Sequence, residues 1–415
     1  LFRSVQISST HPADQAAAIP LGDIDGDGAD DFIAAVQDTV TAPADAPLTG
    51  QMYVDASYAR VTFGHDDAAE GTMGKQAVTL KLPAPVLSAS DYGVQSKFAG
   101  GGDYNHDRYD DIAVLVDGGG EYALEGVYIV FGRPAGDWPD EIDLVHEADV
   151  IIAGLDHPQT VADAGDINGN RVDDLLISES GDPWFTTSRG TIYAFGGTTD
   201  FLPGVGTVFH ADFEDGKEGF TFENSIGAPV NGLWHMTDGR ADDAGHSGDR
   251  SVYFGRGETD SGGGSYNVGH TAGRLVSPEI TLSGDQVVAI TSGAVTTELR
   301  FSYLLETEAA GDQWDQAKVY VEVDGGGFVE VAANDPAALV ELTDPSTGWR
   351  QAVVDLTSLL AGVTDGSTLQ FRVEFDTSDD ISNNYEGWYI DDVVLTAAYR
   401  AEDAASTELT GTANY

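Results

Sequence analysis

The sequence predicts an all-β protein, and three observations lead to this prediction. Short segments of alternating apolar and polar residues recur along the chain, bounded by Gly, Asp, Asn and Pro. Glycine is frequent, with 51 residues among 415, whereas the 3.6-residue periodicity of amphipathic helices is scarce. An Asp-rich segment recurs, and each copy leads into an apolar run of strand length. The chain is long enough for two or three domains, each with its own core.

The first 200 residues contain three segments that align without gaps, beginning at Gly22, Gly102 and Gly165. Each reads Gly-Asp-x-Asn/Asp-x-Asp/Asn-x-x-Asp-Asp and continues as an apolar run. Their first aspartates lie 80 (103 − 23) and 63 (166 − 103) residues apart. Each unit later ends in a predicted strand that closes on Phe-Gly, at residues 61–64, 128–132 and 192–196. Such self-similarity is the signature of a repeat architecture.

The repeated loop has the chemistry of a calcium site. Calcium prefers six to eight oxygen ligands, and this loop offers oxygens at alternate positions without any competing thiolate or histidine cluster. The predicted ligands are the side chains at positions 1, 3, 5 and 9 and the carbonyl at position 7: Asp23, Asp25, Asp27, Ala29 and Asp31; Asp103, Asn105, Asp107, Tyr109 and Asp111; Asp166, Asn168, Asn170, Val172 and Asp174. The third loop has only two carboxylates, so we expect it to bind most weakly and the first loop to bind most strongly.

An EF-hand opens with the same spacing but needs a bidentate Glu at position 12. Position 12 is Ala34, Val114 or Ile177, each inside an apolar run, so the EF-hand interpretation fails. Position 6, where the chain must turn sharply, is Gly28 in the first loop, but the other two loops have Arg108 and Arg171 there. Arginine is unfavourable at that position if φ is positive.

With its Asp-rich loops and Phe-Gly strands, region 1–200 resembles the FG-GAP repeats of the integrin α-subunit β-propeller. The resemblance implies that each repeat is one four-stranded propeller blade whose inter-strand loop is shaped by calcium. That propeller has seven blades, and three cannot close a ring. We therefore expect further blades in a larger protein, partners that cover the open edges, or unrecognised strands. The start at Leu1, without Met, also suggests a processed product or a piece of something larger.

Region 201–398 predicts an antiparallel two-sheet sandwich. The period-2 runs are Leu299, Phe301, Tyr303 and Leu305; Val319, Val321 and Val323; and Leu369, Phe371, Val373 and Phe375. Trp349 and Trp388 begin strands and are expected in the core, whereas Trp314 lies between acidic residues and could stack on a sugar ring. Region 399–415 is expected to be a tail or the start of a further blade.

Several motifs of this second region resemble MAM-like jelly-roll modules of secreted bacterial peptidases and surface proteins. They include residues 213–215, 233–235, 246–248 and 275–280, and Gly387-Trp-Tyr-Ile-Asp-Asp-Val393. The resemblance implies an accessory binding or stabilising domain, in some members with a structural calcium. The candidate ligands are Asp212, Glu214, Asp215, Asp391 and Asp392, with a solvated acidic turn as the alternative.

Composition limits the partners and the compartment. The chain has 70 Asp plus Glu against 19 Lys plus Arg, a formal net charge of −51, which excludes nucleic acid or anionic lipid as the main partner. It has no cysteine and no apolar stretch near the ~20 residues needed to span a bilayer. We expect an extracellular or cell-surface bacterial protein in a marine or high-salt medium, where screening relieves self-repulsion.

No catalytic constellation stands out, so a non-enzyme is expected. The segment around His246 and Ser247 departs from the spacing of a nucleophile elbow, and His146 lacks the second His of a zinc peptidase motif. The leading hypothesis is a calcium-stabilised adhesion or ligand-binding module for a surface protein or glycan. The alternatives are an accessory region of a secreted peptidase or polysaccharide-degrading hydrolase, and a structural subunit of an extracellular assembly with neighbouring subunits as partners.

Overall fold

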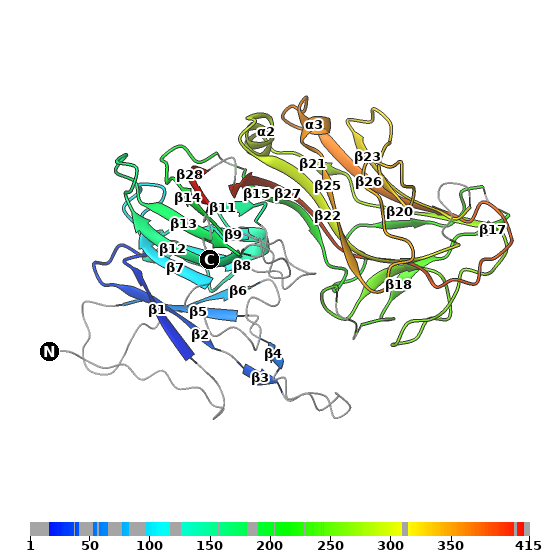
Figure 1. Ribbon diagram of the computed structural model, residues 1–415, viewed down its shortest axis with the longest axis horizontal. Helices are drawn as coiled ribbons and strands as arrows, with labels where there is room; N and C mark the ends of the chain where they lie inside the picture. The colour runs from blue at the N-terminus through cyan, green and yellow to red at the C-terminus, as the bar shows by residue number, and fades with distance from the viewer. Residues whose placement is uncertain are drawn as a thin grey trace, which may run out of the picture. The chain divides into compact units, whose positions relative to one another are not determined.

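The computed structural model describes residues 16–36, 38–40, 53–55, 58–64, 77–82, 97–116, 126–155, 158–180, 190–202, 204–227, 229–241, 243, 245–308, 314–401 and 405–410. They form an all-β protein, as the sequence predicts (Figure 1). The chain divides into two compact units: residues 1–206 with 398–415, and residues 207–397. In the described residues, no helix is long and apolar enough to cross a membrane.

The first sheet is built from the first repeat. Its strands pair antiparallel in the order β1 (Ala16–Gly22), β2 (Asp31–Val36), β5 (Tyr58–Thr62) and β6 (Ala77–Lys81), and β10 (Glu141–Asp143) adds in parallel to β6. Two short strands, β3 (Asp38–Val40) and β4 (Tyr53–Asp55), pair separately. The Asp-rich loop joins β1 to β2.

The second sheet repeats this arrangement with β7 (Phe98–Gly102), β8 (Asp111–Val116), β9 (Gly126–Val130) and β11 (Val150–Ala153). The link from β9 to β11 carries a 3-10 turn (Ala135–Asp137), β10 and the helix α1 (Leu144–Glu147). Strands β8 and β9 are buried throughout, because sheets cover both of their faces.

The third sheet has the strand order β12 (Pro158–Gly165), β13 (Asp174–Glu179), β14 (Thr191–Phe195) and β28 (Ala405–Thr410). All its pairs are antiparallel. Its fourth strand therefore follows the whole second unit in the sequence. Region 399–415 was expected to be a tail or the start of a further blade, but its strand β28 adds to the third sheet by pairing with β14.

The three sheets pack in sequence order, with β7 against both β1 and β12. Each sheet has the same β-bulge just before its Asp-rich loop, between Pro20 and Gly22, Gly100 and Gly102, and Asp163 and Gly165. Strand pairing also corrects one expectation about the repeats. In the third sheet, Phe195 takes the place in the pairing that Thr62 and Val130 have in the first two sheets. The counterpart of Gly64 and Gly132 is therefore Gly197 and not Gly196.

The second unit is a two-sheet sandwich. One sheet contains β15 (Gly206–Ala211), β18 (Trp234–Thr237), β19 (Ser251–Phe254), β22 (Thr296–Glu306), β25 (Arg350–Asp355) and β27 (Gly387–Arg400). The other contains β16 (Thr221–Glu223), β17 (Val230–Asn231), β20 (Thr271–Val276), β21 (Ile280–Thr281), β23 (Gln316–Val323), β24 (Val329–Ala333) and β26 (Thr368–Asp376). Two helices accompany them, α2 (Gly284–Thr291) and α3 (Thr357–Leu360).

The period-2 prediction holds for β26, whose Leu369, Phe371, Val373 and Phe375 are buried and alternate with half-buried residues. Trp388 lies in the core beside Trp234, with ring centroids 5.8 Å apart. Strand β22 departs from strict alternation after Phe301, where every residue to Leu305 is buried. The reason is a second apolar cluster that covers the opposite side of this strand, made of Tyr253, Leu304, Trp349 and Tyr389.

Candidate functional site

The three Asp-rich loops adopt the same backbone conformation. Positions 4 and 6 have positive φ in every loop, whether the residue is glycine or not: Gly26 and Gly28, His106 and Arg108, Gly169 and Arg171. A left-handed conformation costs a non-glycine residue about 1–2 kcal/mol. Three non-glycine residues, His106, Arg108 and Arg171, keep this conformation, which indicates that the loop geometry is imposed by its hydrogen bonds.

Those hydrogen bonds recur at equivalent positions. The position 1 carboxylate accepts the N–H of position 6, at 3.0 Å in the first loop and 2.9 Å in the other two. The position 3 side chain accepts the N–H of position 5, and position 5 accepts that of position 7. The predicted ligand side chains at positions 1, 3 and 5 therefore line one tight turn in all three repeats.

The position 9 aspartate fastens each loop to its own sheet. Asp111 is fully buried and accepts the N–H of Tyr104 at 2.7 Å and that of Gly132 at 2.9 Å. Asp31 and Asp174 make the equivalent bonds in their repeats. Burial, reinforced by Asp107 and Asp103, raises the pKa of Asp111 to about 8, although the two N–H groups oppose the rise.

The position 8 aspartate fastens the second and third loops to the preceding repeat. Asp110 accepts the N–H of Asp23 at 2.8 Å and donates its own N–H to the Asp23 carbonyl at 3.2 Å. Asp173 makes the same pair of bonds with Asp103, at 3.1 and 3.3 Å. The two aspartates that end the motif thus form different hydrogen bonds: position 9 binds within its own sheet, and position 8 binds the preceding sheet.

The first loop has the donor set that best fits a divalent cation. The side chains of Asp23, Asp25 and Asp27 each bring a carboxylate oxygen within 4.8 Å of the others. Asp23 Oδ1 is buried and accepts no hydrogen bond from any residue that the structure describes. Burial, and then the charges of Asp25 and Asp23, raise the pKa of Asp31 to about 7 against the effect of its N–H partners. An all-oxygen set of crowded carboxylates with one unbonded buried oxygen fits calcium.

The other two loops satisfy more of their own oxygens. Asp103 Oδ1 accepts the N–H of Asp107, and Asp166 Oδ1 accepts the N–H of Gly169. In the third loop, the Asn168 amide donates to Asp174 at 2.7 Å and the Asn170 amide donates to the Gly197 carbonyl at 3.0 Å. The carbonyl ligands predicted at Ala29, Tyr109 and Val172, and the order of affinity, stay predictions.

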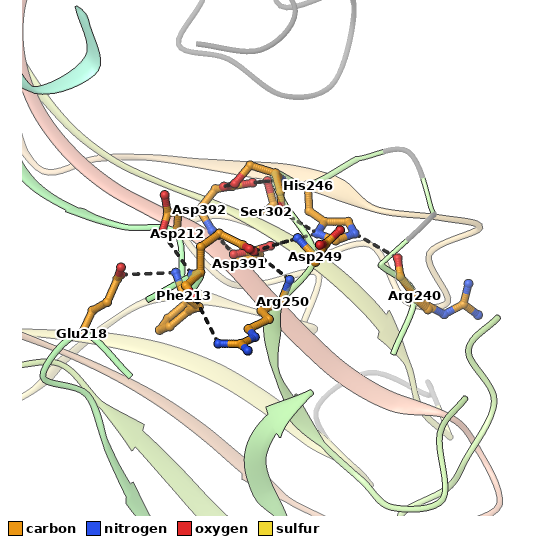
Figure 2. Close-up of polar contacts among 12 residues, drawn as sticks. Asp212, Phe213, Glu218, Arg240, His246, Asp249, Arg250, Ser302, Asp391 and Asp392 are labelled. Atoms are coloured by element: carbon orange, nitrogen blue, oxygen red, sulfur yellow. Dashed lines mark hydrogen bonds and ion pairs between the residues drawn. The ribbon is translucent and has the colours of Figure 1, made fainter. Parts of the chain in front are cut away.

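The second unit brings together four of the five predicted acidic residues, because the charges of Asp392, Glu214 and Asp212 act on Asp391. Figure 2 labels Asp212, Asp391 and Asp392. Asp391 is fully buried, and its pKa is raised by burial first and then by the charges of Asp392, Glu214 and Asp212. The fifth, Asp215, is exposed, and no hydrogen bond or ion pair between described residues joins it to this cluster.

Hydrogen bonds hold the acidic cluster in place. Glu214 accepts the N–H groups of Asp249 and Arg250, at 2.9 and 2.7 Å. Asp392 accepts the N–H of Ser247 at 3.0 Å and the Ser302 hydroxyl at 3.0 Å. A side chain at Gly248 would overlap Glu214, which explains why the cluster needs glycine there.

His246 and Ser247 do not form a nucleophile and base. The imidazole Nδ1 lies 2.9 Å from Asp391 and its Nε2 lies 3.0 Å from the Arg240 carbonyl, while the Ser247 hydroxyl donates to Asp392 instead (Figure 2). The histidine side chain is almost wholly buried and stacks on Trp349, with ring centroids 4.2 Å apart. This histidine is a structural residue. Its motif was visible in the sequence, but its partners Asp391 and Trp349 lie more than 100 residues away.

Trp314 is 42% exposed and is the one aromatic residue among the exposed large apolar side chains of the described chain. The hydroxyl of Ser378 donates to its carbonyl at 2.7 Å, which ties the two loops together. Trp349 and Trp388 are buried, as predicted. Of the six tryptophans in the sequence, Trp314 is thus the one described side chain that offers a free ring surface to a ligand.

Comparison with known proteins gives distant likenesses only. No family model matches the sequence, and no curated protein is similar to it. Structural similarity was found to the glycoside hydrolase domain of Endo-D from Streptococcus pneumoniae R6, at 14% identity and a TM-score of 0.25, over 43% of this chain and 21% of that one. This chain therefore spans about a fifth of the length of that structure.

Two further similarities cover the whole of the other chain. One is CBM27-1 from Caldicellulosiruptor saccharolyticus in complex with mannohexaose, at 14% identity and a TM-score of 0.25, over 48% of this chain and 100% of that one. The other is SGBP-B from a xyloglucan utilization locus in Bacteroides uniformis, at 11% identity and a TM-score of 0.26, over 93% of this chain and 100% of that one. Similarity at this level assigns no function.

Proposed function

We propose that this chain is a non-catalytic, calcium-stabilised binding module of an extracellular bacterial protein, with FG-GAP-type repeats in its first unit and a MAM-like jelly roll as its second. The observation that carries the calcium proposal is the first loop. Three carboxylates converge there, and Asp23 Oδ1 is buried without a hydrogen bond. A buried anionic oxygen without a partner costs free energy that a bound cation would recover.

Calcium would act as a structural ion in this proposal. Asp23, Asp25 and Asp27 would hold it, and its charge would offset the repulsion between their carboxylates. Each loop leads directly into the second strand of its sheet, so a rigid loop would fix that strand's register. In a chain without cysteine, such ions could supply the cross-linking that disulfides give other secreted proteins.

The test is unfolding of the full chain with calcium, with magnesium and with a chelator. Calcium at about 100 times its dissociation constant should stabilise the folded state by about 2.7 kcal/mol. Asp23→Ala should remove most of the gain, and Asp166→Ala less, because Asp166 lies in the loop with the fewest carboxylates. An unchanged unfolding midpoint on addition of calcium would refute the proposal.

The ligand we favour is a glycan, because the exposed ring of Trp314 could stack on a sugar. A protein ligand is the alternative. A glycan array probed with the calcium-loaded chain would identify the sugar class, and Trp314→Ala should reduce binding at least tenfold. The matched control is Leu339→Ala, which removes another exposed apolar side chain of the same unit and should leave binding unchanged. Binding that survives Trp314→Ala would exclude this residue as the platform.

A further inference from the structure

Successive sheets of the first unit cover one another through a fixed set of positions. The residue at loop position 2 is buried in the first two repeats, with Ile24 0% and Tyr104 1% exposed. Its carbonyl accepts an N–H from the next repeat, Ile24 from Arg133 at 3.0 Å and Tyr104 from Thr198 at 2.9 Å. In the third repeat, the same position is Ile167, which is 54% exposed.

A strand position repeats this contrast. Strand pairing makes Ala59, Val127 and Ile192 equivalent. Each pairs with the residue at position 13 counted from its loop, namely Ala35, Leu115 and Ser178. Ala59 and Val127 are 1% and 0% exposed, but Ile192 is 41% exposed. The third sheet therefore presents, at two independent positions, apolar side chains that the following sheet covers in the first two repeats.

The hydrogen bonds of this contact also lack a described partner at the third sheet. Asp23 and Asp103 each exchange two hydrogen bonds with the position 8 aspartate of the next repeat. Asp166 is their counterpart, and no described residue supplies its backbone with that pair of bonds. The third sheet thus offers an acceptor and a donor at Asp166, beside the exposed Ile167.

The first sheet carries the complementary half. Asp30 occupies loop position 8, where Asp110 and Asp173 make the bonds between repeats. Asp30 is exposed, whereas Asp110 and Asp173 are half-buried. Strand pairing makes Arg60 the counterpart of Tyr128 and Tyr193. Arg60 is exposed, whereas the two tyrosines are buried. One chain therefore displays both halves of its own repeat contact, at opposite ends of the three-sheet stack.

We propose that the third sheet of one molecule docks the first sheet of a second copy, head to tail. The Asp30 carboxylate would accept the Asp166 N–H of the partner copy, the Asp30 N–H would donate to the Asp166 carbonyl, and Ile167 and Ile192 would become covered. The copies would repeat the contact already made twice within each chain. Because the two surfaces differ, the contact is heterologous and generates a ring or an open chain of copies.

We favour a second copy over an unrelated partner, because each chain already forms this contact twice between its own repeats. The first sheet of a second copy offers the hydrogen-bonding groups that pair with Asp166 in such a contact. The net charge of −51 opposes such contact between copies. Screening by salt should therefore strengthen the association, which is the opposite of the trend for an interface held by attraction between opposite charges.

The experiment is sedimentation velocity of the full chain over a wide concentration range at low and high salt. Concentration-dependent species larger than a monomer are expected, more abundant at high salt. Ile167→Lys and, separately, Ile192→Lys should each shift the chain to monomer, while Ile381→Lys, an exposed isoleucine of the second unit, should not. A strictly monomeric chain at all concentrations, or association that survives both variants, would overturn the proposal.

Mixing two variants tests the head-to-tail geometry. Ile167→Lys blocks the third-sheet end but keeps the Asp30 end, and Asp30→Arg does the reverse. Each alone should be monomeric, and an equimolar mixture should form a dimer and nothing larger, because each partner contributes one intact end. A mixture that stays monomeric, or that forms larger species, would contradict this contact. The dimer would also show that both variants fold.

Discussion

The carboxylate of Asp110 accepts a 2.8 Å hydrogen bond from the backbone N–H of Asp23, 87 residues earlier in the chain. Because Asp110 also donates its own N–H to the Asp23 carbonyl, this one residue clamps two successive repeats. Hydrogen bonds to a charged group contribute about 1.5–3 kcal/mol each. The bond to the Asp110 carboxylate should therefore contribute about that much to the cohesion between the first and second sheets.

Asp110→Ala should lower the free energy of unfolding by about 2 kcal/mol, since it leaves the Asp23 N–H without its partner. Asp30→Ala is the matched control, because Asp30 occupies the same loop position but is exposed. Its effect should stay within about 0.5 kcal/mol. Urea unfolding at protein concentrations low enough to avoid association measures both, and equal effects would show that the clamp adds nothing to stability.

Gly132→Ala should destabilise the second sheet by about 2 kcal/mol or more, through overpacking. A Cβ at Gly132 would overlap the Asp110 carbonyl and the Tyr109 side chain, and Gly64 and Gly197 have the equivalent carbonyls against them. Gly136→Ala is the control, since its Cβ would meet nothing within 4 Å. If the two variants unfold at the same urea concentration, the close approach of the loop to Gly132 is not tight in solution.

The sequence predicts the repeats well because loop chemistry and strand pattern are local. The spacing of Asp23, Asp25 and Asp27, and the apolar run that follows, carry both the turn and the strand. The conformation of Arg108 was harder to foresee. Arginine disfavours positive φ, yet its φ is 81°, because its N–H is bound by Asp103 and the loop is closed around it.

Long-range pairing accounts for what the sequence does not reveal. Nothing near residue 405 indicates that its strand pairs with β14, since the two are separated by the whole second unit. The acidic cluster of the second unit was predicted from Asp391 and Asp392, but His246 joins it only because the fold carries that loop to β27. Local pattern also placed Asp215 in the cluster, but this residue is exposed.

Stability should depend on pH through Asp315, which is buried beneath the Tyr266 hydroxyl and the Glu308 N–H. Burial, helped by the charges of Glu308 and Asp379, raises the pKa of Asp315 to about 6, and its two hydrogen-bond donors oppose the rise. A raised pKa favours the protonated carboxyl in the folded state. Its contribution to stability is therefore full below about pH 4 and is lost as the pH rises through about 6.

Asp315→Asn should remove this dependence, because the amide carries no titrating proton. As the pH rises from 4 to 6, the free energy of unfolding of the wild type should fall relative to that of the variant. Above pH 6 the difference should level off. Urea unfolding at pH 4, 5, 6 and 7 measures it, with the exposed Asp365→Asn as the control. Parallel curves for wild type and Asp315→Asn would mean that this carboxyl titrates equally in the folded and unfolded chain.

Deleting residues 402–415 should loosen the third sheet selectively, because β28 (Ala405–Thr410) is the outer partner of β14. Without it, the N–H groups of β14 that face β28 lose their acceptors and exchange with solvent. Strand β9 is the internal control, since its neighbours β8 and β11 remain. Hydrogen exchange followed by mass spectrometry should show faster exchange in peptides from residues 191–195 and unchanged exchange in 126–130. Unchanged exchange in β14 would mean that β28 is dispensable. Faster exchange in both strands would mean that the deletion unfolds the whole first unit, so that the fourth strand supports all three sheets rather than the third alone.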